Sequence, residues 1–340
     1  MATHINVDDP AVQEAILRFD KHARLEGTCI EQVCADELLG PHAAANGCEV
    51  SREWWFERRR EGYTVRKFLP RDQPSAADKA VLNWMAARGV PVNLARFDAQ
   101  LGGFVEMKAG VPDEGKIHLL PRWPPVYGVD AAHSPDRSSL ALRFLAERDL
   151  LRPTALARLY INQILDLQFF WDVDAFLVVP PAPEPPPRVI REVPYFKWKP
   201  PANGAVAGKV LAAIEVSHKY PDPRHSTFGV NAGAARLSDW MQSALEVPAY
   251  HIVLAKPVWD NDYPALKMLE GELGAKSYWI GARLPTELAR RPSNAGMVSL
   301  RMSEFSYLKI LGKEQPNYFA DLLAGKTVRP VRGLPRVDVE

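Results

Sequence analysis

The chain lacks most features that would assign it at once to a well-marked class of protein. Its 340 residues include only three cysteines and carry a formal net charge of +1. No apolar run reaches the roughly 18 residues of a transmembrane helix, and the polar N-terminus has no signal-peptide core. The sequence therefore predicts a cytoplasmic protein with no membrane partner.

Several motifs of common enzyme classes are absent as well. The chain has no G-x-x-x-x-G-K-[ST] or G-x-G-x-x-G phosphate loop, no G-x-S-x-G elbow and no H-E-x-x-H zinc motif. These absences argue against P-loop NTPases, most classical dehydrogenases and α/β-hydrolases. No internal repeat is visible. The near-neutral net charge leaves nucleic-acid binding open, because only local patches of charge would decide it.

The three cysteines, Cys29, Cys34 and Cys48, all lie in the first fifty residues. Their odd number and the absence of C-x-x-C argue against a disulfide framework. Together with His42 they would provide the ligands of a Cys₃His zinc site, but their spacing does not match the common zinc motifs. We therefore favour reduced, buried thiols.

Two short apolar runs carry acidic residues where a core strand should have none. Residues 171–179 (WDVDAFLVV) and 210–221 (VLAAIEVSHKYP) have the composition of buried strands. Asp172 and Asp174 lie in the first run and Glu215 in the second. Because an unpaired carboxylate is costly to bury, these acids predict a cation beside them.

Two kinds of cation are compatible with these acids. Oxygen ligands on neighbouring strands would suit a hard metal ion such as Mg²⁺. Alternatively, the acids are structural groups at strand ends that pair with a basic side chain of the same region. The candidates for such pairing are Lys219, Arg188 and Lys209.

An aspartate on one strand and Glu-x-Lys on the next resemble the motif of the PD-(D/E)xK nucleases, the restriction-endonuclease-like superfamily. Here Asp174 is followed by Glu215-x-Ser217, so a serine occupies the position of the family's lysine. Lys219 stands two residues further on. Strand side chains alternate between faces, so Glu215, Ser217 and Lys219 share one face if the strand continues. The resemblance covers roughly residues 150–285.

The resemblance implies an α/β fold, with a mixed central sheet flanked by helices, joined here to an α+β N-terminal region. It also implies hydrolysis of DNA phosphodiester bonds with Mg²⁺ or Mn²⁺ as cofactor. Asp174 and Glu215 would bind the metal, with Asp172 as the alternative ligand. Lys219 would orient or activate the attacking water, or stabilise the developing charge. The third metal ligand has no candidate.

Further residues near the motif extend this predicted site. His218, Arg224 and His225 are close enough in sequence to contact a phosphate. A second Glu-x-Lys, at Glu106 and Lys108, ranks well below Glu215 because no suitable acid-bearing strand precedes it.

Two rival functions remain from other classes. Because a serine stands at position 217 in place of the family's lysine, the chain could be a catalytically degenerate nuclease fold. Such a protein would bind nucleic acid or serve as a subunit of a larger complex. The proline-rich loop from Pro180 to Pro187 favours polyproline II and would suit recognition by a protein partner. The sequence does not indicate an oligomeric state.

We expect three regions along the chain. Residues 1–130 form a mostly helical α+β region, 131–296 the nuclease-like α/β core, and 297–340 a helical extension with a basic tail. We interpret this tail as a surface-wrapping extension rather than a nucleic-acid contact. It carries Lys326, Arg329, Arg332 and Arg336.

One aromatic and arginine-rich stretch has two interpretations. Residues 51–63 (SREWWFERRREGY) could stack bases and grip phosphates. We favour an amphipathic helix instead, with the Trp face in the core and the Arg face in solvent, paired to Glu53, Glu57 and Glu61 at helical spacing.

Overall fold

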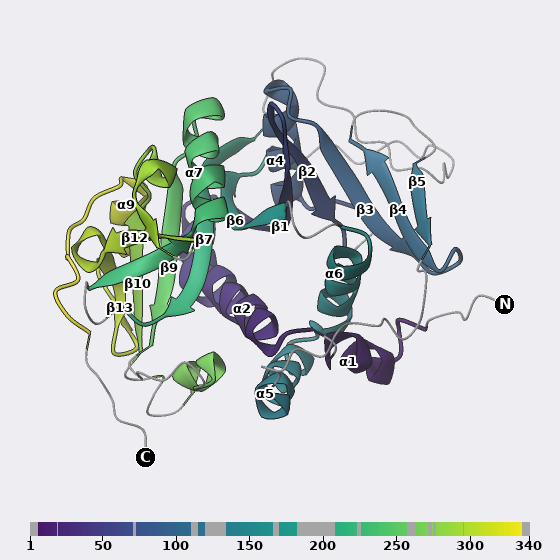
Figure 1. The fold of residues 1–340 in the computed structure, drawn as a ribbon, viewed down its shortest axis with the longest axis horizontal. Helices are drawn as coiled ribbons and strands as arrows, with labels where there is room; N and C mark the ends of the chain where they lie inside the picture. Colours follow the sequence, from purple (N-terminus) through teal and green to yellow (C-terminus); the bar gives the residue numbers. More distant parts are fainter. Residues whose placement is uncertain are drawn as a thin grey trace. The chain divides into compact units, whose positions relative to one another are not determined.

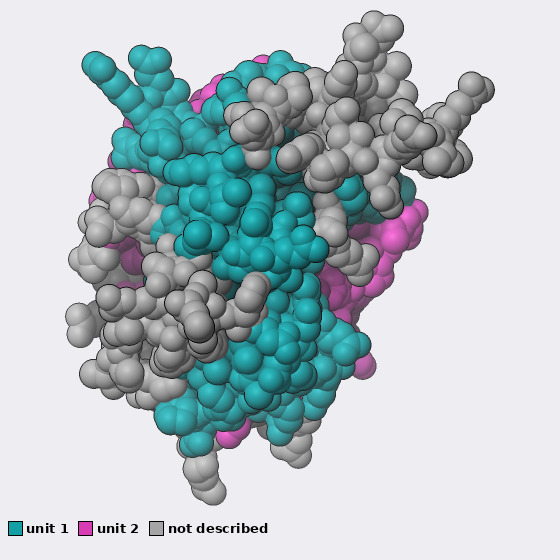
Figure 2. Space-filling model, turned by 90° about the vertical axis from the view of Figure 1, so that its right-hand side faces the viewer, with its two compact units in different colours: residues 1–25, 47–210 teal, residues 26–46, 211–340 magenta. Residues whose placement is uncertain are grey.

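The computed structural model describes residues 6–18, 20–70, 73–109, 115–119, 134–165, 170–181, 208–222, 226–256, 263–270, 274, 277–294 and 296–334. The chain forms two compact units, which Figure 2 colours separately. Unit 1 comprises residues 1–25 and 47–210, and unit 2 comprises residues 26–46 and 211–340. The fold is mixed α/β, with helices flanking mixed sheets (Figure 1). The expected core, 131–296, is thus shared between the two units.

The described residues of unit 1 form six strands, ordered β6-β1-β2-β3-β4-β5. Within this set only β2 and β3 pair in parallel. The strands are β1 (Glu49–Arg59), β2 (Gly62–Phe68), β3 (Val92–Asp98), β4 (Gly103–Lys108), β5 (Lys116–Leu119) and β6 (Phe170–Val179). The runs 104–110 and 116–121, separated by Pro112-Asp113-Glu114-Gly115, predict a hairpin. The antiparallel pairing of β4 with β5 confirms it, while residues 110–114 lie outside the described residues.

Helix α4 (Ala76–Ala87) connects the parallel strands β2 and β3. Its N-terminus is a capping box, in which the Ser75 side chain accepts from the Asp78 amide and Asp78 accepts from the Ser75 amide. Gly89, two residues past the helix, has φ +67°, the left-handed conformation that favours glycine. The serine and the glycine that bound residues 75–89 predict a helix in this stretch, and α4 confirms it.

Both faces of the unit 1 sheet are buried under aromatic side chains. On one face, Trp84 of α4 packs on Phe176, which also contacts Trp54. On the other face, Tyr160 of α6 (Leu151–Gln163) packs on Phe68 and Phe104. Two further helices belong to this unit, α1 (Pro10–Arg18) and α5 (Pro135–Ala146). The Asp9-Pro10 cap and the apolar spacing after it predict one helix to about Leu25, but α1 ends at Arg18 and α2 begins at His22.

The prediction of a helix over residues 51–63 is wrong, because this stretch forms most of β1 and its turn into β2. Trp54 and Trp55 are both buried, and consecutive buried residues suit a strand that is covered on both faces. The expected solvated arginines are confirmed, since Arg58, Arg59 and Arg60 are exposed. The Glu–Arg spacing that suggests helix pairs instead serves the hairpin, where Glu57 bonds Arg66 across the strands at 3.0 Å.

Unit 2 contains the strand order β14-β13-β10-β9-β7, and among these described strands β7 and β9 pair in parallel. The strands are β7 (Lys209–Lys219), β9 (Ala249–Ala255), β10 (Tyr278–Arg283), β13 (Ser306–Ile310) and β14 (Lys313–Glu314). Helix α7 (Ala232–Ala244) connects β7 to β9, with Asn231 as its N-cap. The sequence predicts strands over 210–221, 249–257 and 276–284 and a helix over 231–245, and β7, β9, β10 and α7 confirm these elements.

A second, three-stranded sheet in unit 2 has the order β11-β12-β8. Its strands are β8 (Thr227–Asn231), β11 (Ser293–Asn294) and β12 (Met297–Arg301). The turn residues of 220–233 predict a loop, but residues 227–231 form β8, where apolar Phe228 and Val230 alternate with exposed or half-buried residues. The sequence also predicts a helix over 263–273, and the described part of that stretch contains a 3₁₀ turn at Ala265–Leu269 instead.

The remaining helices of unit 2 come from both ends of the chain. Helix α2 (His22–Val33) crosses the unit boundary and continues through a π-helical segment, Cys34–Leu39, into α3 (Gly40–Ala45). Near the C-terminus, α9 (Tyr318–Leu323) packs against β13 and β10. The Tyr318 hydroxyl bonds the Leu38 carbonyl and so ties α9 to the π-helical segment.

The two units share an order of elements, although no internal repeat is visible in the sequence. Each has a strand, a crossover helix and a parallel strand, β2–α4–β3 in unit 1 and β7–α7–β9 in unit 2. Each parallel strand is followed by two antiparallel neighbours, β4 and β5 in unit 1 and β10 and β13 in unit 2. The candidate acid of β7, Glu215, thus lies on the first strand of such a crossover.

Candidate functional site

Strand β7 continues without interruption through Lys219, as the proposed alternation requires. Its parallel pairing with β9 runs from Ala213 opposite Ala249 to Lys219 opposite Ala255. Because side chains alternate along a strand, Glu215, Ser217 and Lys219 point to one face of the sheet. The structure therefore brings these three residues together in the expected register.

The ammonium of Lys219 is held inside unit 2 rather than extended into solvent. Its Nζ donates to the carbonyl oxygen of Gly229 on β8 at 2.5 Å. Burial lowers the pKa of Lys219, and the neighbouring charge of Glu215 partly opposes this shift. A lysine with a lowered pKa exchanges its proton more readily near neutral pH than an exposed one.

A histidine that the sequence analysis missed completes this row of polar groups. His251 of β9 lies opposite Glu215 in the ladder and is only 1% exposed. Its Nε2 is 2.8 Å from Ser217 Oγ, the atom at the position of the family's lysine. The sequence contains a signal for His251, because it is a lone histidine within the apolar run 249–255. A polar side chain in a buried strand needs a partner, as the acids of β6 and β7 do.

Burial and the charge of Lys219 lower the pKa of His251 to about 3. The imidazole is therefore neutral at physiological pH and carries one ring proton. Among the described residues, its Nδ1 has no hydrogen-bond partner. Such an orphaned buried nitrogen is costly and needs an explanation in the chemistry of the site.

Apolar side chains cover the same face of β7 and β9. Phe228, Phe305 and Val253 belong to one core cluster with Ala235 of α7. The ring of Phe305 lies 5.9 Å from that of His251. Glu215, Ser217 and Lys219 are each half-buried. They form, with His251, a polar row within an apolar layer of unit 2.

The aspartates of the predicted site lie on β6, in unit 1. Asp174 is 7% exposed, whereas Asp172, opposite Trp55 in the ladder, is exposed. The β1–β6 pairing skips the position of Asp174, and Glu53, which would oppose it, has φ +64°. Asp174 and Glu215 thus belong to different units, and their joint binding of a metal ion stays a prediction.

Of the residues predicted to contact phosphate, the structure describes only His218. His218 is half-buried, and alternation along β7 turns it away from the face of Lys219. Arg224 and His225 lie outside the described residues. The same holds for most of the loop from Pro180 to Pro187, of which only Pro180 and Pro181 are described.

No three His, Cys, Asp or Glu side chains in the described ranges come together so as to hold a metal ion. The three cysteines are buried and form no disulfide, which confirms the expected thiols. His42 bonds Glu314 at 2.9 Å and stacks on Phe319, 5.7 Å between ring centroids.

The lower-ranked Glu-x-Lys of β4 has a structural role. Glu106 is buried and bonds Arg66, and the Asn93 amide donates to it at 2.7 Å. His118 Nε2 lies 3.2 Å from the same carboxylate. These neighbours compensate the charge of Glu106 within the sheet.

Comparison with known proteins found no family model, no curated protein and no solved structure that matches this chain. The site is therefore interpreted from its own geometry and from the sequence motif. None of the helices described has both the length and the apolar character needed to span a membrane.

The buried His251 predicts a distinct pH dependence of stability. Its pKa is about 3 in the folded chain and about 6.5 in the unfolded chain. Between these values the unfolded state binds one more proton, so acidification costs the fold about 1.4 kcal/mol per pH unit. In His251→Gln, the free energy of unfolding measured with urea should fall less steeply with decreasing pH than in wild type. An unchanged pH slope would contradict this, and His42→Gln, at a half-buried histidine, serves as the control.

Proposed function

We propose that the chain is a metal-dependent nuclease that hydrolyses DNA phosphodiester bonds, with Mg²⁺ or Mn²⁺ as cofactor. The observation that carries the proposal is the shared face of Glu215 and Lys219 on β7, where burial lowers the pKa of the lysine. A carboxylate beside a readily deprotonated amine is the pair needed to bind a hard metal and to handle the proton of an attacking water.

The donor set fits such a metal in part. Glu215 offers carboxylate oxygens, the ligands that Mg²⁺ and Mn²⁺ prefer. A bound metal would polarise the phosphate and lower the pKa of its water. Lys219 would orient that water or take its proton, and the neutral His251 fixes the hydroxyl of Ser217 beside it. The assignment of Asp174, with Asp172 as the alternative, rests on the sequence motif.

A specific observation favours a second function, a degenerate nuclease fold that binds nucleic acid without cleaving it. Lys219 donates to Gly229 and Ser217 contacts His251. Both groups therefore have partners inside the protein. A lysine committed to its carbonyl partner would secure β8 to the sheet instead of activating water.

Cleavage assays separate these two functions. Plasmid and single-stranded DNA are incubated with the full chain in Mg²⁺, Mn²⁺ or EDTA. A nuclease should nick or degrade at least one substrate with a metal and neither substrate with EDTA. Binding of DNA without cleavage under every metal would establish the degenerate function.

Metal binding itself should depend on Glu215. Titration calorimetry with Mn²⁺ should show weaker binding in Glu215→Gln, by about tenfold or more, because an amide lacks the charge of the carboxylate. The melting temperature should stay near wild type. Glu287→Gln, an exposed acid of unit 2 paired to Arg290, is the matched control. Identical Mn²⁺ affinity in Glu215→Gln and wild type would remove Glu215 from the site.

A further inference from the structure

An uncompensated positive surface lies along one edge of unit 2. It is formed by β14 and by residues 326–334, and we call it the basic edge. Its four exposed cations are Lys313, Lys326, Arg329 and Arg332. Among the described residues, none of the four forms an ion pair. Other cations of unit 2 do, such as Arg290 with Glu287 and Arg291 with Glu304.

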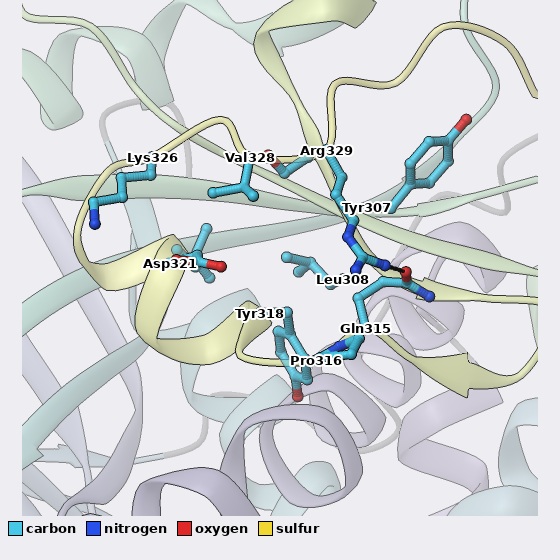
Figure 3. A pocket seen from close by; sticks show the side chains of 11 residues that line it. Tyr307, Leu308, Gln315, Pro316, Tyr318, Asp321, Lys326, Val328 and Arg329 are labelled. Atoms are coloured by element: carbon cyan, nitrogen blue, oxygen red, sulfur yellow. Dashed lines mark hydrogen bonds between the residues drawn. The ribbon is translucent and has the colours of Figure 1, made fainter.

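Two acids, Glu314 and Asp321, lie near this edge, and neither pairs with one of its four cations among the described residues. The Glu314 carboxylate is engaged by His42 at 2.9 Å. Asp321 lies in α9, beside the cations but in no ion pair among the described residues. The Arg329 guanidinium donates to the side-chain amide of Gln315, a neutral acceptor that leaves its charge uncompensated. Figure 3 shows this contact, with the Lys326 ammonium turned away from it.

The backbone of the basic edge is fixed to strand β13. The Tyr307 amide donates to the Arg329 carbonyl at 3.1 Å, and the Val331 amide donates to the Phe305 carbonyl at 2.9 Å. The Tyr307 hydroxyl adds a bond of 2.6 Å to the Gly333 carbonyl. The cations are thus presented on an ordered extension of the sheet, which lowers the entropic cost of binding.

The hollow beneath the basic edge is too small for an organic ligand. Its volume is about 20 Å³, the space of about one water molecule. Leu308, Leu322 and Val328 line it together with Asp321 and Arg329 (Figure 3). Ligands of this edge must therefore bind across its surface.

We propose that the basic edge binds the sugar–phosphate backbone of DNA. A row of exposed cations without carboxylate partners complements a regular row of phosphates, and each contact releases a condensed counterion. The choice of DNA rests on the proposed function. The sequence favours a surface-wrapping tail, and in the structure the backbone bonds to Phe305 and Tyr307 fix these cations in place.

The test measures binding without catalysis. Anisotropy of a labelled duplex of about 20 base pairs is recorded in EDTA between about 50 and 200 mM salt. The variant Lys326→Gln with Arg329→Gln and Arg332→Gln should bind about ten- to hundredfold more weakly at low salt. Its slope of log affinity against log salt should fall by about 2–3, near 0.9 for each lost contact.

A matched control removes the same charge elsewhere in unit 2, as Lys267→Gln with Arg290→Gln and Arg301→Gln. This control should keep most of the affinity and slope. Equal losses in both variants, or no loss in the edge variant with an unchanged melting temperature, would overturn the proposal. Tighter binding of labelled polyglutamate than of DNA would assign the edge to an acidic protein instead. If the wild type binds DNA through the edge but never cleaves it, only the nuclease function fails.

Discussion

Replacing Lys67 by methionine should lower the free energy of unfolding by about 3–5 kcal/mol, the cost of leaving a buried charge without its partner. Lys67 of β2 and Asp78 of α4 are 4% and 8% exposed, and Lys67 Nζ lies 3.1 Å from the Asp78 carboxylate. Methionine keeps most of the packing volume, so the loss reports on charge. Urea unfolding of wild type and variant at neutral pH measures it.

The partners of Asp78 explain why the loss should be large. The Ser51 hydroxyl donates to this carboxylate at 2.6 Å, and the Trp54 indole donates to the same hydroxyl at 2.8 Å. Burial alone raises the pKa of Asp78, but the charge of Lys67 and the bonds from Ser51 and Ser75 hold it below its usual range. Without Lys67, a charged carboxylate remains in a buried network.

A double substitution distinguishes the cost of an unpaired buried charge from the loss of the Lys67 side chain itself. Lys67→Met with Asp78→Asn removes both charges. The asparagine oxygen can still accept from the Ser75 amide, and its amino group can donate to the Ser51 hydroxyl in place of the bond that Asp78 accepts. The double variant should recover a substantial part of the lost stability. A single variant within about 1 kcal/mol of wild type, or a double variant less stable than Lys67→Met, would contradict the argument.

Much of the fold could be predicted where local signals and tertiary burial agree. Helix α4 is bounded by a serine cap and a glycine, and β7 and β9 are short apolar runs between turn residues. In β1 the two kinds of signal disagree. Glu57 and neighbouring arginines have helical spacing, but Trp54 and Trp55 are consecutive and both buried. Only a sheet that is covered on both faces can bury Trp54 and Trp55 together. The helices that cover it, α4 and α6, come from distant parts of the sequence.

The candidate site was predictable along a strand but not across strands. Alternation places Glu215, Ser217 and Lys219 together from the sequence alone. The contact of Ser217 with His251 and that of Lys219 with Gly229 depend on the crossover through α7 and on the packing of β8. Neither follows from local pattern. For the same reason, the shared order of elements in the two units leaves no trace in the sequence.

Replacing Lys219 should abolish DNA cleavage if this lysine acts on the attacking water. Lys219→Met keeps the buried stem while removing the amine, and the cleavage rate should fall by about 10²–10⁴-fold. DNA affinity in EDTA should persist, because one phosphate contact is a small part of a larger footprint. Lys219→Ala should behave alike in cleavage but lose more stability through the cavity it creates.

Lys219→Arg distinguishes the two roles open to this residue. Arginine keeps the positive charge but does not give up its proton. If Lys219 stabilises developing charge, the arginine variant should retain part of the activity. If it carries the water's proton, the variant should be as inactive as Lys219→Met, and Ser217→Lys with Lys219→Ala should regain some cleavage from the same strand face. Full activity in Lys219→Met, with an intact fold by melting temperature, would exclude the lysine from the reaction and leave it as the bond that secures β8 through Gly229.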